Sequence, residues 1–220
     1  QIIARVSPQA APGNDGNLFA VYGVGVDDAN GNVWVTNTRQ DTVAVYRQSD
    51  LSLVKQYPVG AVSHARDVVV DAQRNRAYVS ATGADNISLF DTRTLQQLDN
   101  ITIASGKRGE TFTPGSLDID TATGKVYTVS LAAAEAAIID GASGKVEKVF
   151  PLAGARDAIC VLLNPVAKRL LVVSHGSDNL LIVDPATAKF DHDVYVGAGS
   201  LNVSYSPSTR LAYVSNRAAG

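Results

Sequence analysis

Apolar residues alternate with small or polar residues in short runs along most of the chain. Val24 and Val26 lie two residues apart with Gly25 between them, and Val68 and Val70 have the same spacing. A period of two places successive side chains on opposite faces of a β-strand. Gly, Asn, Asp and Pro occupy the gaps between runs, where they favour turns. The pattern predicts short strands throughout, and we interpret the alanine-rich segment 131–139 as a strand too.

One short motif recurs five times along the chain. Its copies include VWVTN, AYVSA, VYTVS and AYVSN, and the spacings between successive copies are 44, 49, 44 and 42 residues. A repeat of about 40–45 residues is typical of a four-stranded β-propeller blade. We therefore predict an all-β fold, a β-propeller of four-stranded antiparallel blades. The copies align on Trp34, Tyr78, Tyr127, Leu171 and Tyr213.

The repeat also predicts the domain organisation. The fifth unit reaches only its second strand, whereas a propeller closes its ring. We expect residues 1–220 to form a single β-propeller domain that is an incomplete part of a ring. Its expected parts are the outer strand of one blade at 1–7, blades at about 20–60, 64–105, 113–153 and 157–197, and a half blade at 200–220.

The repeated motifs, together with strands that end in Asp before a DxxT turn, resemble the YVTN-repeat β-propellers of bacteria and archaea. Residues 17–37, 64–80 and 200–220 are most similar to the periplasmic YncE-like propellers of that family, which have seven blades. The resemblance implies a seven-bladed ring, a periplasmic location, and a binding role in the bacterial envelope with single-stranded DNA as ligand. A shared fold does not by itself carry a shared function.

The amino-acid composition excludes some classes of function. Hydrophobic residues make up 45% of the chain, enough for a core, and the formal net charge is −2. This balance excludes a strongly basic nucleic-acid domain but not a local basic patch. The single cysteine, Cys160, excludes an internal disulfide, and its apolar neighbours predict a buried structural thiol. No apolar run approaches 18 residues, so we predict no membrane span in the given chain.

Basic residues gather in the loops that, in a propeller, lie together at one face. Arg and Lys supply most phosphate contacts, and aromatic rings stack on bases in proteins that bind single strands. Phe19 and Tyr22 are additional aromatic candidates near this face. The predicted ligand-binding residues are Arg39, His64, Arg66, Lys107, Arg108, Phe112, Arg156, His175 and Arg217.

Acidic residues in the same loops support a plainer interpretation, in which the charges are solvated and form local Arg–Asp pairs. Asp41, Asp85 and Asp178 share one repeat position, which predicts acceptors for backbone N–H groups rather than catalytic groups. Asp91, Asp140 and Asp184 share the position at the next turn, with the same expectation.

No catalytic residue, metal site or cofactor is predicted. The repeat position of His175 holds no histidine in the other units, although a mixed site of His64, His175 and an acid stays open. The favoured function is non-enzymatic binding of single-stranded DNA or another anionic ligand. The alternatives are a scaffold for protein–protein interaction, with an envelope or cell-surface partner, and a small-molecule hydrolase such as a lactonase. The insertion at 106–115 occurs in one unit only, so we expect it to contribute to specificity.

Overall fold

The computed structural model describes residues 2, 4–8 and 20–218. These residues form eighteen strands and one short 3₁₀ helix, η1 (Thr38–Gln40). The strands make five antiparallel sheets, of which four have four strands and one has two, so the all-β prediction is confirmed. In the described part of the chain, no helix is long and apolar enough to cross a membrane.

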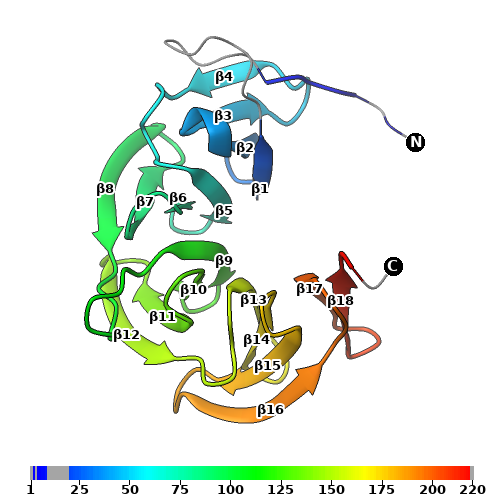
Figure 1. Ribbon diagram of the computed structural model, residues 1–220. Coiled ribbons are helices and arrows are strands. Elements are labelled where there is room, and N and C mark those ends of the chain that lie inside the picture. Colours follow the sequence, from blue (N-terminus) through cyan, green and yellow to red (C-terminus); the bar gives the residue numbers. More distant parts are fainter. Residues whose placement is uncertain (1, 3, 9–19, 219–220) are drawn as a thin grey trace. The chain divides into compact units, whose positions relative to one another are not determined.

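The chain divides into two compact units, Gln1–Thr102 and Ile103–Gly220, and each is described by itself. Unit 1 contains two sheets in which every strand pairs with the next one along the chain (Figure 1). The first sheet consists of β1 (Val21–Asp27), β2 (Asn32–Asn37), β3 (Thr42–Arg47) and β4 (Leu53–Gln56). The second consists of β5 (Ala65–Asp71), β6 (Arg76–Ala81), β7 (Asn86–Asp91) and β8 (Gln96–Thr102).

Unit 2 repeats the same topology in three sheets (Figure 1). The first consists of β9 (Pro114–Asp120), β10 (Lys125–Ser130), β11 (Glu135–Asp140) and β12 (Lys145–Pro151). The second consists of β13 (Ala158–Asn164), β14 (Arg169–Ser174), β15 (Asn179–Asp184) and β16 (Lys189–Tyr195). The third has only β17 (Ser200–Ser206) and β18 (Leu211–Asn216).

Two of the segments expected to be strands differ in detail. In the alanine-rich segment, residues 131–133 form a turn and the strand β11 begins at Glu135. In the segment 1–7, residues 2 and 4–7 form no strand, while residues 1 and 3 lie outside the described part. Phe19, an additional aromatic candidate, also lies outside it.

Three aromatic rings fill the core of unit 1. The ring centroid of Trp34, on β2, lies 5.5 Å from that of Phe90 on β7 and 6.1 Å from that of Tyr57. Tyr57 and Phe90 meet edge to face at 4.9 Å. Such pairs add about 0.5–1.5 kcal/mol beyond the area they bury. Since Trp34 and Phe90 come from different sheets, the aromatic cluster fastens the first sheet to the second.

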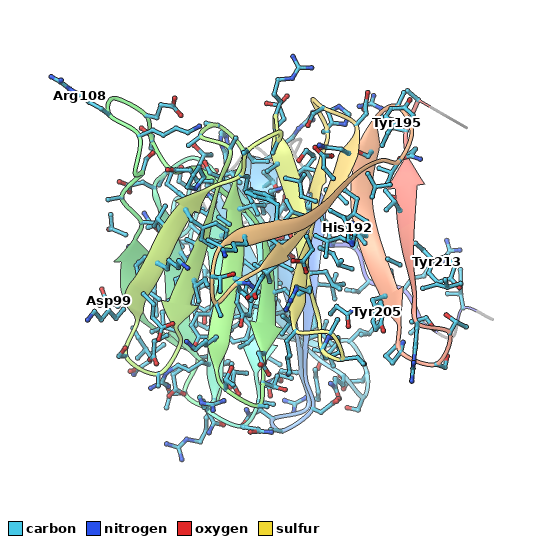
Figure 2. The ribbon with its side chains drawn as sticks, turned by 90° about the horizontal axis from the view of Figure 1, so that it is seen from below. Asp99, Arg108, His192, Tyr195, Tyr205 and Tyr213 are labelled. Carbon is cyan, nitrogen blue, oxygen red and sulfur yellow. The ribbon has the colours of Figure 1, made fainter. Side chains whose placement is uncertain are left out.

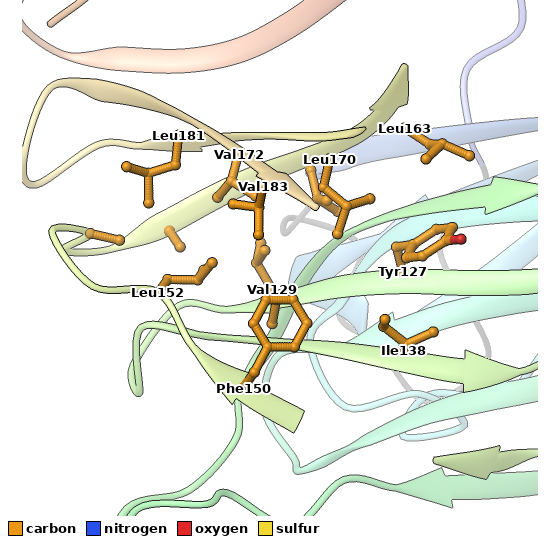
Figure 3. Packing of buried hydrophobic residues seen from close by; sticks show 14 residues of the cluster. Tyr127, Val129, Ile138, Phe150, Leu152, Leu163, Leu170, Val172, Leu181 and Val183 are labelled. Atoms are coloured by element: carbon orange, nitrogen blue, oxygen red, sulfur yellow. The ribbon is translucent and has the colours of Figure 1, made fainter. Parts of the chain in front are cut away.

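The core of unit 2 is mainly aliphatic. Leu170 and Leu181, on β14 and β15, are fully buried and belong to the same cluster as Val129 and Phe150 from the preceding sheet (Figure 3). Each sheet therefore uses its apolar face to bury the face of its neighbour within the unit. This packing is non-directional, and it is the dominant stabilising contribution in a fold of this kind.

The first strand of every sheet carries an irregularity at its start. In β1 the register shifts between Val21 and Val24, and in β5 it shifts between Ala65 and Val68. The same shift occurs at the start of β9, β13 and β17. An extra residue in one strand is a β-bulge, which bends the strand and re-aims its side chains. Side chains near each bulge therefore point in other directions than strict alternation along the strand would give them.

The repeated motif supplies partners for the bulges of unit 1. The N–H of Gly23 in the first bulge donates to Thr36 Oγ1 at 2.8 Å, and the N–H of Asp67 in the second donates to Ser80 Oγ at 2.9 Å. Thr36 and Ser80 are the fourth residues of VWVTN and AYVSA. A hydroxyl at this position therefore satisfies a backbone donor that the bulge removes from the ladder.

Candidate functional site

The predicted ligand-binding residues lie at one end of their sheets. Because consecutive strands are antiparallel, the turns after the first and third strands leave at one end of a sheet, which we call the turn end. The loops after the second and fourth strands leave at the other, which we call the loop end. Every bulge described above lies at the start of a first strand, next to the loop end.

In unit 1, Asp41 connects two loops at the loop end. Its carboxylate Oδ1 accepts the backbone N–H of His64 at 2.7 Å. In unit 2, Asp178 Oδ1 accepts the N–H of Gly199 in the same way, also at 2.7 Å. For these two residues the prediction of a backbone acceptor is confirmed, although each reaches the loop that leads into the next sheet rather than its own turn. His64 is exposed, as is Arg39.

Tyr22 and Arg66 form a stacked pair at the loop end of unit 1. The guanidinium carbon of Arg66 lies 4.4 Å from the centre of the Tyr22 ring, and its Nη2 donates to the Tyr22 hydroxyl at 2.7 Å. A cation over an aromatic face is attracted by the ring quadrupole. The Tyr22 side chain remains 58% exposed. The structure therefore joins one of the predicted basic residues to an exposed aromatic ring.

The insertion in unit 2 is held by a buried carboxylate that the sequence reasoning missed. Glu135, 2% exposed, accepts the hydroxyl of Ser105 at 2.7 Å and the N–H of Gly106 at 3.1 Å. A buried charge requires such hydrogen bonds. The signal was present in the sequence, because the first residue of the third strand is Thr42, Asn86 or Asn179 in the other four-stranded sheets.

Two of the predicted residues in this insertion have structural roles. Lys107 donates to the carbonyl of Ala133, which ties it to the same loop as Glu135. Phe112 is fully buried, so the prediction that its ring stacks on a ligand was wrong. A large apolar ring is more stable in the core than in water, which explains this placement. Arg108 projects from the tip of the insertion (Figure 2).

Three other predicted residues also lie at the loop end of unit 2. Arg156 is exposed and its Nη2 donates to the carbonyl of Gly176, while Nδ1 of His175 lies 3.1 Å from the carbonyl oxygen of Ser200. Arg217 is exposed, and only its backbone N–H has a partner among the described residues, the carbonyl of Gly199.

Ion pairs are concentrated away from the loop ends. Arg74 pairs with Asp71 at 2.7 Å and Arg76 with Asp91 at 3.1 Å, all at turn ends. At a loop end, Lys107 pairs with Glu110 at 3.9 Å. This loop-end pair joins a lysine to a glutamate, whereas the local pairs predicted for the loops were of Arg with Asp.

The turn-end aspartates have the predicted backbone role. Asp140 Oδ1 accepts the N–H of Ser143 at 2.8 Å, and Asp184 Oδ1 accepts that of Ala186 at 2.9 Å. These hydrogen bonds stabilise the charged form and hold the pKa of both carboxyl groups below the ordinary value. Asp91 is similar, its pKa lowered first by the N–H of Thr94.

Neither a metal cluster nor a reactive thiol is apparent at the described loop ends. No group of three or more His, Cys, Asp or Glu side chains among the described residues could hold a metal ion. Cys160 is buried, with Sγ 3.3 Å from Asn202 Oδ1, as expected for a structural thiol. A pocket of about 290 Å³ in unit 2 lies at the turn end, against Asp118, Leu163 and Tyr205, and none of the predicted residues lines it.

The repeated four-stranded antiparallel sheets define a β-propeller fold, and comparison with solved structures agrees. Neither known family models nor curated protein sequences match the chain. Hydrazine synthase of Kuenenia stuttgartiensis matches with a TM-score of 0.75 and 14% identity, over 92% of this chain and 58% of that one. A streptogramin B lyase matches with a TM-score of 0.71 and 12% identity, over 89% of this chain and 68% of that one.

A third similar structure is that of a nidogen/laminin complex, with a TM-score of 0.66, 16% identity, and coverage of 82% of this chain and 65% of that one. The chain thus spans 58% of the first of these structures and 65–68% of the other two. At these identities the similarity shows the fold alone.

Proposed function

We propose that this propeller is a non-enzymatic binding protein whose loop ends bind an anionic ligand, with single-stranded DNA as the candidate. The resemblance of its repeats to YVTN-repeat propellers of the YncE-like kind supports this ligand and a periplasmic location. Phosphate contacts from Arg and Lys dominate the affinity of such binding and need no deep pocket.

The observation that carries the proposal is a group of exposed arginines at the loop ends. Arg39, Arg108 and Arg217 are exposed, and their side chains have no hydrogen-bond or ion-pair partner among the described residues. Two of the loop-end acids, Asp41 and Asp178, accept backbone N–H groups rather than pairing with these arginines. Arginines in this state retain their full capacity to contact phosphate.

The test measures binding of a labelled oligonucleotide of about 30 thymidines by fluorescence anisotropy, between about 20 and 300 mM salt. The variant combines Arg39→Ala, Arg108→Ala and Arg217→Ala. For single strands, each lost phosphate contact lowers the salt slope by about 0.7, so the triple variant should lose about 2.

A matched control removes three exposed cations from the turn ends, as Arg93→Ala, Lys145→Ala and Lys189→Ala. It carries the same change in net charge, so it should keep the wild-type salt slope. No binding by the wild type at low salt would reject the proposal, and so would equal losses in the two triple variants.

A second candidate function is a protein–protein scaffold. Tyr195 on the outer strand β16 is 72% exposed (Figure 2). Exposed aromatic side chains are enriched at protein interfaces, and one similar structure is from a nidogen/laminin complex. A partner from envelope extract that survives nuclease treatment and is lost on Tyr195→Ser would favour this function over the first.

A further inference from the structure

The stacked pair in unit 1 is a departure from the repeat. Tyr22 and Arg66 occupy the same position in successive sheets, one residue after the pairs Val21–Asn37 and Ala65–Ala81 that flank the bulges. The corresponding residues of β9, β13 and β17 are Gly115, Ile159 and Leu201. A residue that serves the blade itself recurs from blade to blade. An aromatic ring and a guanidinium at this position in two successive sheets therefore call for another explanation.

Hydrogen bonds from Thr36 fix the backbone that carries the pair. Thr36 Oγ1 donates to the carbonyl of Arg66 at 2.7 Å and accepts the N–H of Gly23 at 2.8 Å. Gly23 has no side chain to separate the strands, since a Cβ there would lie 2.7 Å from the carbonyl oxygen of Arg66. A pair ordered before binding loses little conformational entropy when a ligand arrives.

The pair offers two kinds of contact side by side. Arg66 covers part of the Tyr22 ring, but 58% of the tyrosine stays exposed to a second planar group. The guanidinium has five N–H donors. One binds the tyrosine hydroxyl, and the buried Nε of Arg66 has no acceptor among the described residues.

We infer that Tyr22 and Arg66 form a nucleotide subsite, in which a base stacks on Tyr22 and Arg66 donates to the adjacent phosphate. The inference rests on the proposed function and specifies one point of contact for the single strand. Base–aromatic stacking tolerates any base, because every base has a π-face. Arg suits the phosphate of the nucleotide because its planar N–H donors match the phosphate oxygens.

The experiment compares an oligothymidylate with an abasic strand of the same length, which keeps the phosphates and lacks the bases. The wild type should bind the base-bearing strand more tightly by about five-fold to a hundred-fold. Tyr22→Leu should remove most of this preference without changing the affinity for the abasic strand. Tyr22→Phe, which keeps the ring, should retain the preference.

Two controls separate this inference from the proposed function. Tyr195→Leu removes another exposed tyrosine and should keep the wild-type preference. Tyr22→Leu should melt within about 4 °C of the wild type, because the loss is limited to the contact with Arg66. If the wild type binds both strands equally, or Tyr22→Leu keeps the preference, the subsite is rejected while the anionic-ligand function stands. If the wild type binds neither strand, the proposed function itself is rejected.

Discussion

Replacement of Gly23 by alanine tests how the stacked pair is built. The new Cβ would lie 2.7 Å from the carbonyl oxygen of Arg66 and 2.9 Å from the Cα of Asp67. Ordinary contacts begin at 3.4 Å. Both obstructing atoms belong to the backbone of β5, so no side-chain rotation relieves them, and β1 and β5 must move apart by roughly 0.7 Å, beyond what a close-packed interior absorbs without strain.

Overpacking of this kind costs about 1–3 kcal/mol. For a chain of this size, each kcal/mol corresponds to a melting temperature about 2–4 °C lower. We therefore expect Gly23→Ala to melt about 2–12 °C below the wild type, near the upper end because the clash is with backbone. The separation also moves Tyr22 away from Arg66, so the preference for a base-bearing strand should weaken together with stability.

The assay is thermal unfolding followed by circular dichroism, with Gly25→Ala as the matched control. A Cβ on Gly25 would meet Cγ2 of Val70 at 3.1 Å and the carbonyl oxygen of Val68 at 3.2 Å, both longer than the contacts at Gly23, so a smaller loss is expected. A Gly23→Ala protein at least as stable as Gly25→Ala would refute the close approach of β1 and β5.

Three further predictions concern the insertion, the core and the turns. Glu135→Ala should release the insertion, so that trypsin cuts after Arg108 several-fold faster than in the wild type, as mass spectrometry would show; an unchanged rate would contradict the anchoring role. Phe112→Ala should lose about 3–5 kcal/mol in urea unfolding, because a fully buried ring leaves a cavity; a loss below about 1 kcal/mol would mean that the ring is not in the core. Asp140 and Asp184 have lowered pKa values in the folded state, so their contribution is present above pH 4 and is lost as the pH falls through the folded values. The double variant with Asn at both positions should therefore lose less melting temperature than the wild type between pH 5 and about 2, and parallel curves would count against it.

Much of the loop-end chemistry was visible in the sequence as residue types but not as contacts. Arg39 and Arg108 are exposed, as their place in polar loops suggested. Phe112 lies in an equally polar stretch, yet it is buried, because its neighbours in space are set by the packing of unit 2. Glu135 differed from its counterparts in the repeat, but the residues it binds lie 29 and 30 positions earlier in the chain.

The sequence by itself determined most of the strands, their turns and the period of the repeat. These depend on local rules, the alternation of side chains along a strand and the hydrogen bonds of residues such as Asp140 to the next turn. The tertiary structure alone decided which side chains meet. Tyr22 and Arg66, which form the stacked pair, are 44 residues apart in the chain. It forms because two bulges and Gly23 bring β1 and β5 together, and no local pattern contains that information.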